Sequence, residues 1–237
     1  MRLLILILLA FLWTPLRAQD KDYYIRFNQL IRGIELGRIP KAKAEKELQE
    51  YLKNLPSSKL GVHKPWIFPL AGYDFHAIGG NAGEGYQEKG YSFLDGNKHK
   101  AHPADDIFIL DRNQDNLDDR NLKPVQVRSI LDGVVIAEND EWETVSKLRG
   151  GKYIVLYHPE ARIFSYYAHN QKIFLKPGDW VKAGQEIAEV GRTGLNAYKK
   201  RSPTHLHFSS FRIVEGSLRP FNPYGELKNS WTNSLHP

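Results

Sequence analysis

Apolar residues repeat with a helical period near the start of the chain. They stand three or four positions apart: Tyr24, Phe27, Leu30, Ile31 and Ile34. Gly37 and Pro40 end this pattern, and a second, charge-rich helix is predicted over residues 41–54 with Leu48 and Leu52 on one face. We therefore predict a helical hairpin, followed by a linker that ends at residue 58. The hairpin either packs on the main domain or serves as an inhibitory or docking arm.

From Trp66 onward the pattern changes to short apolar runs separated by Gly, Pro, Asn and Asp, which predict β-strands joined by turns. The predicted strands cover residues 106–110, 125–130, 133–137, 152–157, 163–168 and 185–190, with an edge strand over 66–70. Residues 78–90 are rich in glycine and predict a long loop of the kind that is often functional. No helical period appears in this region, so the expected fold class is mainly β with a small N-terminal helical hairpin.

One further predicted strand, within residues 202–210, carries two histidines. His205 and His207 alternate with Leu206 and Phe208, so the imidazoles and the apolar side chains point to opposite faces. The two imidazoles are then about 6 to 7 Å apart on one face. One of them can bind a metal while the other handles a proton. A pair of surface histidines on an edge strand is the alternative.

The first residues indicate the compartment. Arg2 precedes an apolar run over 3–13, and Pro15 and Ala18 follow, which is the layout of a secretory signal peptide over residues 1–18. The run is too short to span a bilayer comfortably, although an uncleaved anchor is the alternative. With no cysteine, the sequence offers no lipid-attachment residue and no disulfide framework. We expect an exported protein, periplasmic or secreted, with no stable membrane span after signal cleavage.

Composition narrows the choice of partners and sets the domain layout. The formal net charge of +6 falls to +4 without Arg2 and Arg17 of the predicted signal peptide, and a mildly basic exported protein would be attracted to anionic envelope polymers. Solubility alone is an equal explanation of this charge. No basic run is interleaved with aromatic residues, so nucleic-acid binding has little support. The expected layout is a signal peptide over 1–18, a helical segment and linker over 19–58, and a β domain over 59–237.

Other histidines extend the candidate chemistry. His102 and Asp106 stand four positions apart, so an extended backbone places both side chains on one face and Asp105 on the other. Two imidazoles and one carboxylate form a set that zinc accepts while a fourth position stays open for water. His169 follows the predicted strand over 163–168. Taken alone, the spacing of His102 and Asp106 favours a structural ion pair, and a single histidine such as His169 is usually a solvated or capped residue.

Together, three motifs resemble the LytM/lysostaphin-type zinc endopeptidases of peptidase family M23. They stand in the order seen in that family: His102-x-x-x-Asp106, Tyr167-Ala-His169 and His205-x-His207-Phe208. The sequence between the second and third motifs, over residues 176–191 and at Thr193-Gly194, also resembles this family. The resemblance as a whole covers residues 64–224. Ala104 departs from the family, whose members commonly carry glycine at that position, but a small residue is kept.

The resemblance implies an antiparallel β-sheet core of the LytM/M23 (duplicated hybrid motif) type. It implies that His102, Asp106 and His207 bind Zn²⁺, and that His169 and His205 are the catalytic pair. Which of the two is the general base and which stabilises the oxyanion stays open. Together with export, the resemblance implies a metalloendopeptidase that hydrolyses the peptide cross-links of bacterial peptidoglycan, with stem peptides as its partners.

Two functions of other classes compete with this interpretation. Some relatives in the family have lost metal ligands and activate other cell-wall hydrolases, so a non-catalytic regulator or binding module is the alternative. Here all five positions are intact. Val181, Gly184 and Gly191 echo the hairpins of biotinyl or lipoyl carriers, which require an acceptor lysine at an exposed tip.

An acidic loop offers a second candidate ion site. Oxygen-bearing side chains stand at positions 1, 3, 5 and 9 of this loop: Asp111, Asn113, Asp115 and Asp119. The spacing resembles half of a calcium-binding loop, with Asn116 in place of the turn glycine and no glutamate at position 12. The loop therefore predicts weak Ca²⁺ binding, and an Asx-rich surface turn is the alternative.

Overall fold

The computed structural model describes residues 18–57, 64–98 and 100–232. The predicted signal peptide lies outside these ranges except for Ala18, at which the first helix begins. Among the described residues, no helix is long and apolar enough to cross a membrane.

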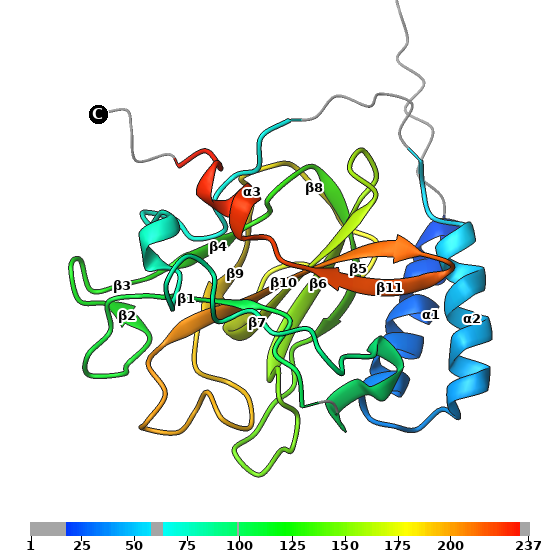
Figure 1. Cartoon of the computed structure of the whole chain (residues 1–237), viewed down its shortest axis with the longest axis horizontal. Coiled ribbons are helices and arrows are strands. Elements are labelled where there is room, and N and C mark those ends of the chain that lie inside the picture. The colour runs from blue at the N-terminus through cyan, green and yellow to red at the C-terminus, as the bar shows by residue number, and fades with distance from the viewer. Residues whose placement is uncertain (1–17, 58–63, 99, 233–237) are drawn as a thin grey trace, which may run out of the picture.

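A nine-stranded sheet forms the centre of the molecule (Figure 1). Its strands are β1 (Asp105–Phe108), β4 (Gln126–Arg128), β5 (Gly133–Asn139), β6 (Lys152–His158), β7 (Ile163–Ile173), β8 (Trp180–Val181), β9 (Glu186–Val190), β10 (His205–Val214) and β11 (Ser217–Phe221). The main path runs β1-β10-β7-β6-β5-β8, while β11 pairs with β10, and β9 pairs with β7 and β4. A separate hairpin joins β2 (Leu117–Asp118) to β3 (Lys123–Pro124). The strand pairs are antiparallel, which confirms the predicted fold class.

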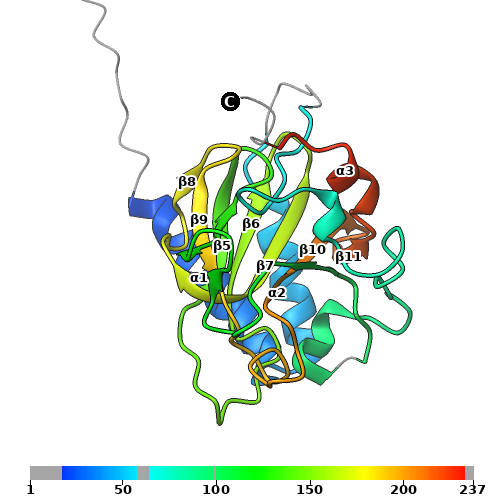
Figure 2. The ribbon, with the colours of Figure 1, turned by 90° about the vertical axis from the view of Figure 1, so that its left-hand side faces the viewer.

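The predicted helical hairpin is confirmed as α1 (Ala18–Glu35) and α2 (Lys41–Lys53). The two helices lie side by side, and α1 packs on β5 (Figures 1 and 2). The apolar face of α1 enters a buried cluster with the sheet, in which Phe27 and Ile34 contact a group that includes Val134 and Phe164. Because this face is buried in the core, the packing interpretation of the hairpin is favoured over a detachable arm.

The opposite face of the sheet covers a second apolar core. Leu206 and Phe208 of β10 are fully buried there, together with Trp66 and Ile107. Burial of a side chain of this size contributes roughly 1.5–3 kcal/mol. The alternation predicted for β10 is therefore real, and it leaves His205 and His207 on the face that is shared with α1.

Other predictions about the elements were incomplete or wrong. Residues 66–70 form no strand but only isolated bridges at Ile67 and Leu70, and Pro69 has no N–H with which to extend a ladder. The loop over 78–90 contains no helix or strand, as predicted, and is flanked by the 3-10 helices η1 (Phe75–Ala77) and η2 (Phe93–Lys98). The pattern missed β11 and the short helix α3 (Tyr224–Lys228).

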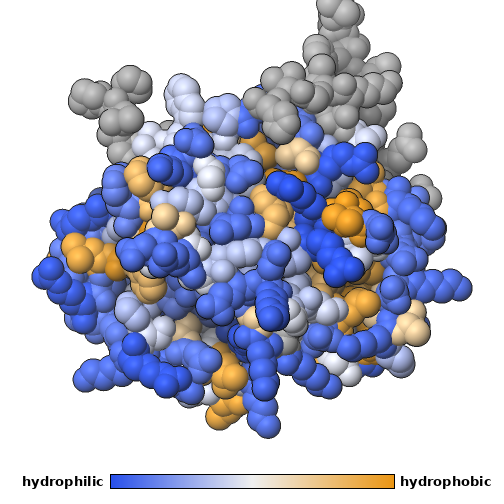
Figure 3. All heavy atoms as spheres, viewed as in Figure 1, coloured by the Kyte–Doolittle hydropathy of each residue, from blue (hydrophilic) through white to orange (hydrophobic). Residues whose placement is uncertain are grey.

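The outer surface carries no broad apolar face in the view of Figure 3, where it is mostly hydrophilic with small, separate hydrophobic patches. Exposed large apolar side chains occur singly, as at Leu122, Val145 and Trp231. Scattered exposure of this kind is normal for a globular protein.

Candidate metal centre

Strand pairing brings three potential ligands together. Asp106 of β1 lies directly opposite His207 of β10 in the antiparallel register. Nδ1 of His207 lies 3.0 Å from Oδ1 of Asp106, and Nε2 of His102 lies 3.3 Å from the same oxygen. One ligand atom from each of the three residues lies within 4.8 Å of the others. The structure therefore places the predicted His-Asp-His set around one point.

The donor chemistry of this cluster fits a zinc ion. Zinc accepts imidazole nitrogen and carboxylate oxygen in a tetrahedral site, and binding requires an ionised carboxylate and neutral imidazoles. Burial opposes ionisation of Asp106, but hydrogen bonds from His102 and His207 outweigh burial and hold the pKa of Asp106 well below its usual range. Burial also lowers the pKa of His207. The hydrogen bond to Asp106 raises the pKa of His102, and a cation bound there would take the place of that proton.

The glycine-rich loop orients one of the ligands. Nδ1 of His102 donates to the backbone carbonyl of Gly85 over 3.0 Å, and this bond leaves Nε2 to face Asp106. The backbone N–H of Gly79 also donates to the carbonyl of Asp106 over 2.9 Å. Such outer contacts fix the tautomer and the orientation of metal-binding imidazoles. The loop over 78–90 thus supports the cluster.

Two further histidines lie against the cluster. The ring centre of His169 is 4.9 Å from that of His205 and 5.4 Å from that of His207. Nδ1 of His205 lies 2.7 Å from the carbonyl oxygen of Pro203, and Nδ1 of His169 lies 2.7 Å from that of Thr193. Because a carbonyl oxygen only accepts, each Nδ1 carries the proton and each Nε2 presents a lone pair. Both imidazoles are therefore arranged to accept a proton at Nε2.

The backbone around His169 is unusual. His169 has a φ of 68°, in the left-handed region that side chains rarely adopt, and its N–H donates to the carbonyl of Gly150 over 2.9 Å. Burial, followed by the nearby His205 and His207, holds the pKa of His169 well below its usual value. The ring is therefore held neutral in a strained but hydrogen-bonded position.

The structure separates Asp105 from Asp106, as the alternation predicted. Asp105 is only 1% exposed, lies opposite Phe208, and does not belong to the His-Asp-His cluster. Neither of its carboxylate oxygens has a hydrogen-bond partner among the described residues. Burial, followed by the charge of Asp106, raises the pKa of Asp105 to about 6.

The acidic loop that predicted calcium binding directs its oxygens to other partners. Asp111 accepts hydrogen bonds from the backbone N–H groups of Asp115 and Asn116 and from the hydroxyl of Thr204. Asp115 accepts from the N–H of Leu117, over 2.9 Å. Asp119 accepts from the backbone N–H of Arg112 over 3.2 Å. Such contacts are those of an Asx-rich turn, so the geometry favours that alternative and Ca²⁺ stays a prediction.

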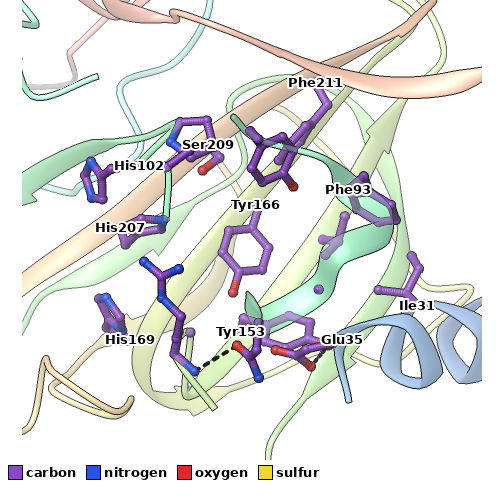
Figure 4. A pocket seen from close by; sticks show the side chains of 18 of the residues that line it. Ile31, Glu35, Phe93, His102, Tyr153, Tyr166, His169, His207, Ser209 and Phe211 are labelled. Atoms are coloured by element: carbon purple, nitrogen blue, oxygen red, sulfur yellow. Dashed lines mark hydrogen bonds between the residues drawn. The ribbon is translucent and has the colours of Figure 1, made fainter. Parts of the chain in front are cut away.

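A cavity of about 330 Å³ begins at the His-Asp-His cluster (Figure 4). Its lining includes His102, His207 and His169 at one end and residues of α1, among them Glu35, at the other. Tyr166 lies between the two ends in this view. The cavity therefore links the candidate metal site to the N-terminal helix.

Sequence reasoning missed several residues that shape this site. Thr193 was noted only as part of a family-like motif, and nothing in a sequence shows that its carbonyl oxygen accepts from His169. Glu35 had a usable signal, since it stands four positions after Ile31 and therefore continues the buried face of α1. An acidic residue at such a position is unusual enough to indicate a specific role.

The antiparallel sheet presents a His-Asp-His cluster that could hold a metal ion, with two further histidines beside it. Residues 118–223 match peptidase family M23. The chain thus has the M23 peptidase-family fold, which confirms the resemblance of its motifs. His102 and Asp106 lie before the matched segment, and their place in the site comes from the geometry described above.

Comparisons with individual proteins cover shorter stretches. The lipoprotein NlpD/LppB homolog of Pseudomonas aeruginosa is 41% identical over 64 residues, which are 27% of this chain and 19% of that protein. Outer membrane antigenic lipoprotein B of Histophilus somni is 44% identical over 62 residues, which are 26% of this chain and 16% of that protein. The chain therefore spans less than a fifth of the length of these curated relatives.

Solved structures with similarity include two peptidases. The catalytic domain of the antimicrobial peptidase lysostaphin from Staphylococcus simulans is 26% identical, with a TM-score of 0.38 over 56% of this chain and 81% of that chain. A zinc-containing peptidase from Vibrio cholerae is 24% identical, with a TM-score of 0.42 over 66% of this chain and 39% of that chain.

Proposed function

We propose that this chain is an exported zinc metalloendopeptidase that hydrolyses the peptide cross-links of bacterial peptidoglycan. The observation that carries the proposal is the convergence of His102, Asp106 and His207, whose ligand atoms lie within 4.8 Å of one another. Two more histidines lie beside this cluster with Nδ1 bound to a backbone carbonyl oxygen, which leaves Nε2 as the acceptor of the neutral imidazole. A peptidase of this type needs both parts, the metal ligands and the proton acceptors.

The chain's own groups divide the work as follows. When bound, zinc supplies an acidified water and a polarised carbonyl. Nε2 of His205 lies 3.7 Å from Oδ1 of Asp106, close enough to take a proton from a water at the cluster. The ring centre of His169 lies 4.9 Å from that of His205, and His169 offers a second such nitrogen. The imidazole that takes the proton can then give it to the leaving amine.

The substrate and the compartment are supported by family and by relatives. Residues 118–223 match peptidase family M23, which supports a peptide substrate. Both curated relatives are called lipoproteins, one of them of the outer membrane. These names support an envelope location. We therefore propose that this chain, too, is exported to the cell envelope.

The experiment that tests the proposal is digestion of purified muropeptides with the full chain, followed by product masses. We expect one zinc ion per chain and cleavage of cross-linked dimers into monomers. A chelator should abolish cleavage, and added zinc should restore it. Stoichiometric zinc without cleavage would support the non-catalytic regulator instead, and cleavage that persists without metal would overturn the mechanism.

Two histidine variants separate metal binding from proton transfer. His207→Ala should lose zinc and activity together, because it removes a ligand. His205→Ala should keep zinc and lose turnover by roughly 10²–10⁴-fold, the usual contribution of general acid–base catalysis. His76→Ala is the matched control, since His76 is exposed and its Nδ1 lies 2.9 Å from the carboxylate of Asp74. Release of zinc from the His205 variant would require the two assignments to be exchanged.

A further inference from the structure

The cavity that begins at the His-Asp-His cluster extends well beyond it. It continues past Tyr166 to the last turn of α1, where Glu35 lies at the far end (Figure 4). Its volume of about 330 Å³ lies within the range of pockets that bind small ligands, roughly 300–1,000 Å³. The cavity as a whole is therefore large enough to receive one side chain of a peptide whose backbone lies across the His-Asp-His cluster.

Most of the wall at this far end is apolar or aromatic. It is lined by Ile31, Ile34, Tyr91, Phe93, Phe211 and Leu218. Walls of this kind pack well against methylene groups, and they offer no counter-charge to a carboxylate. Arg149 lines the same cavity, and its charge acts on Tyr166 and on His102, nearer the metal cluster.

Among the described residues, Glu35 is held by a neutral hydrogen-bond donor and not by an ion pair. Its Oε2 accepts a hydrogen bond from the hydroxyl of Tyr153 over 2.9 Å. Among the described residues it forms no ion pair, although Arg32 on the same helix favours its ionised form. Burial is the larger effect and raises the pKa of Glu35 to about 7. A carboxylate in apolar surroundings is costly unless it is paired, so a cation from outside would complete this site.

We propose that this pocket binds a substrate side chain that ends in a primary amine, with its ammonium group on Glu35 and its methylene groups on the apolar wall. The proposal rests on the proposed function, because it assigns the pocket to a diamino acid of the cross-linked stem peptides whose own side-chain amine takes no part in the cross-link. It also makes α1 a part of the substrate pocket. The competing explanation is that Glu35 only anchors α1 to the sheet through Tyr153.

The test compares two peptides that differ only in the amine. A single, uncross-linked stem peptide with a free side-chain amine, and the same peptide with that amine acetylated, are titrated into the full chain by calorimetry. The wild type should bind the free amine about tenfold more tightly, since a hydrogen-bonded charge pair is lost on acetylation. Glu35→Gln should erase this preference, because it removes the charge and keeps an acceptor for Tyr153.

A matched variant and a second measurement make the outcomes distinct. Glu45→Gln removes an exposed acid from α2, in the same hairpin, and should keep the full preference. Equal binding of the two peptides by the wild type, or a preference that survives Glu35→Gln, would overturn the inference. Cleavage is measured separately on cross-linked dimers. A chain that selects the amine and cleaves nothing would therefore contradict the proposed function and still support this pocket.

Discussion

At the scale of single residues, backbone carbonyls hold the site in place. Three of its histidines donate from Nδ1 to main-chain oxygens, those of Gly85, Thr193 and Pro203. His207 alone turns Nδ1 toward Asp106. Because main-chain atoms do the positioning, changes that move the backbone should disturb the site more than changes to neighbouring side chains.

Gly194→Ala should test this dependence on the backbone. Gly194 has a φ of +115°, and a Cβ there would lie 2.4 Å from the carbonyl oxygen of Arg149 and 2.8 Å from Nδ1 of His169. We expect a loss of stability of about 2–3 kcal/mol from strain and overpacking, and a large loss of turnover with zinc retained. Urea unfolding, zinc content and turnover are the measurements.

Gly90→Ala is the control for the backbone strain alone. Gly90 has a φ of +81°, and no atom lies within 4 Å of the position of a Cβ. The control should lose about 1 kcal/mol and keep its activity. If both variants turned over equally well, the packing of Gly194 against His169 would have no catalytic role.

The residues that carry side-chain chemistry could be predicted, whereas their main-chain partners could not. Strand alternation placed His205 and His207 on one face, and the four-residue spacing placed His102 beside Asp106. The carbonyl of Thr193 has no such signature, because every residue carries a carbonyl and only the fold selects one. The prediction of Ca²⁺ binding shows the converse, since the spacing of the acidic loop suits both an ion and an Asx-rich turn.

At the scale of elements, α1 contributes to the core as much as a strand does. Phe27 is fully buried between the hairpin and the sheet, and its ring stacks on Tyr51 of α2 with centres 4.7 Å apart. The helical period alone predicted this buried face. It could not show which surface α1 would cover, because that choice depends on the apolar faces of β5 and β6.

Phe27→Ala should measure how much this packing contributes. Removing a buried phenylalanine usually costs 3–5 kcal/mol because a cavity remains, and we expect a loss in that range. Ile25→Ala, on the same helix but with its side chain 40% exposed, should change stability by less than about 1 kcal/mol. Urea unfolding of both variants is the measurement. A small loss for Phe27→Ala would indicate that the hairpin is only loosely attached.

Strand ends were harder to predict than strands. β7 continues to Ile173, beyond the apolar run, because its last residues pair with β9, where Lys172 lies opposite Glu189 and Ile173 opposite Ala188. β11 was missed because Pro220 interrupts its pattern, although an edge position tolerates proline. In both cases tertiary hydrogen bonding outweighs the local pattern.

At the scale of the whole molecule, His158 should make folding sensitive to acid. It is fully buried, donates from Nδ1 to the carbonyl of Asp132, and accepts at Nε2 from Ser165. Burial lowers its pKa from 6.5 to about 4. Between these values the unfolded chain binds a proton that the folded chain does not, so stability falls as the pH drops from 6.5 to 4.

We expect the free energy of unfolding to fall by about 3 kcal/mol over this pH range, because the pKa of His158 drops from 6.5 to about 4 on folding. Urea unfolding at several pH values should show it in the wild type. His158→Gln should flatten this part of the profile, whatever it does to stability at pH 7. His76→Gln, which changes an exposed histidine, should leave the profile unchanged. Parallel profiles for the wild type and His158→Gln would exclude His158 as the source.

The pairing of β1 with β10 has a practical consequence for anyone who trims this chain. The segment that matches the family, residues 118–223, contains β10 but neither β1 nor the helix that closes the far end of the cavity. A fragment cut at those borders would keep His207 and discard Asp106. It would also leave the edge of β10 that pairs with β1 exposed to other chains. Expression of the minimal homologous region should therefore yield an inactive product that aggregates, and useful truncations keep the whole of α1.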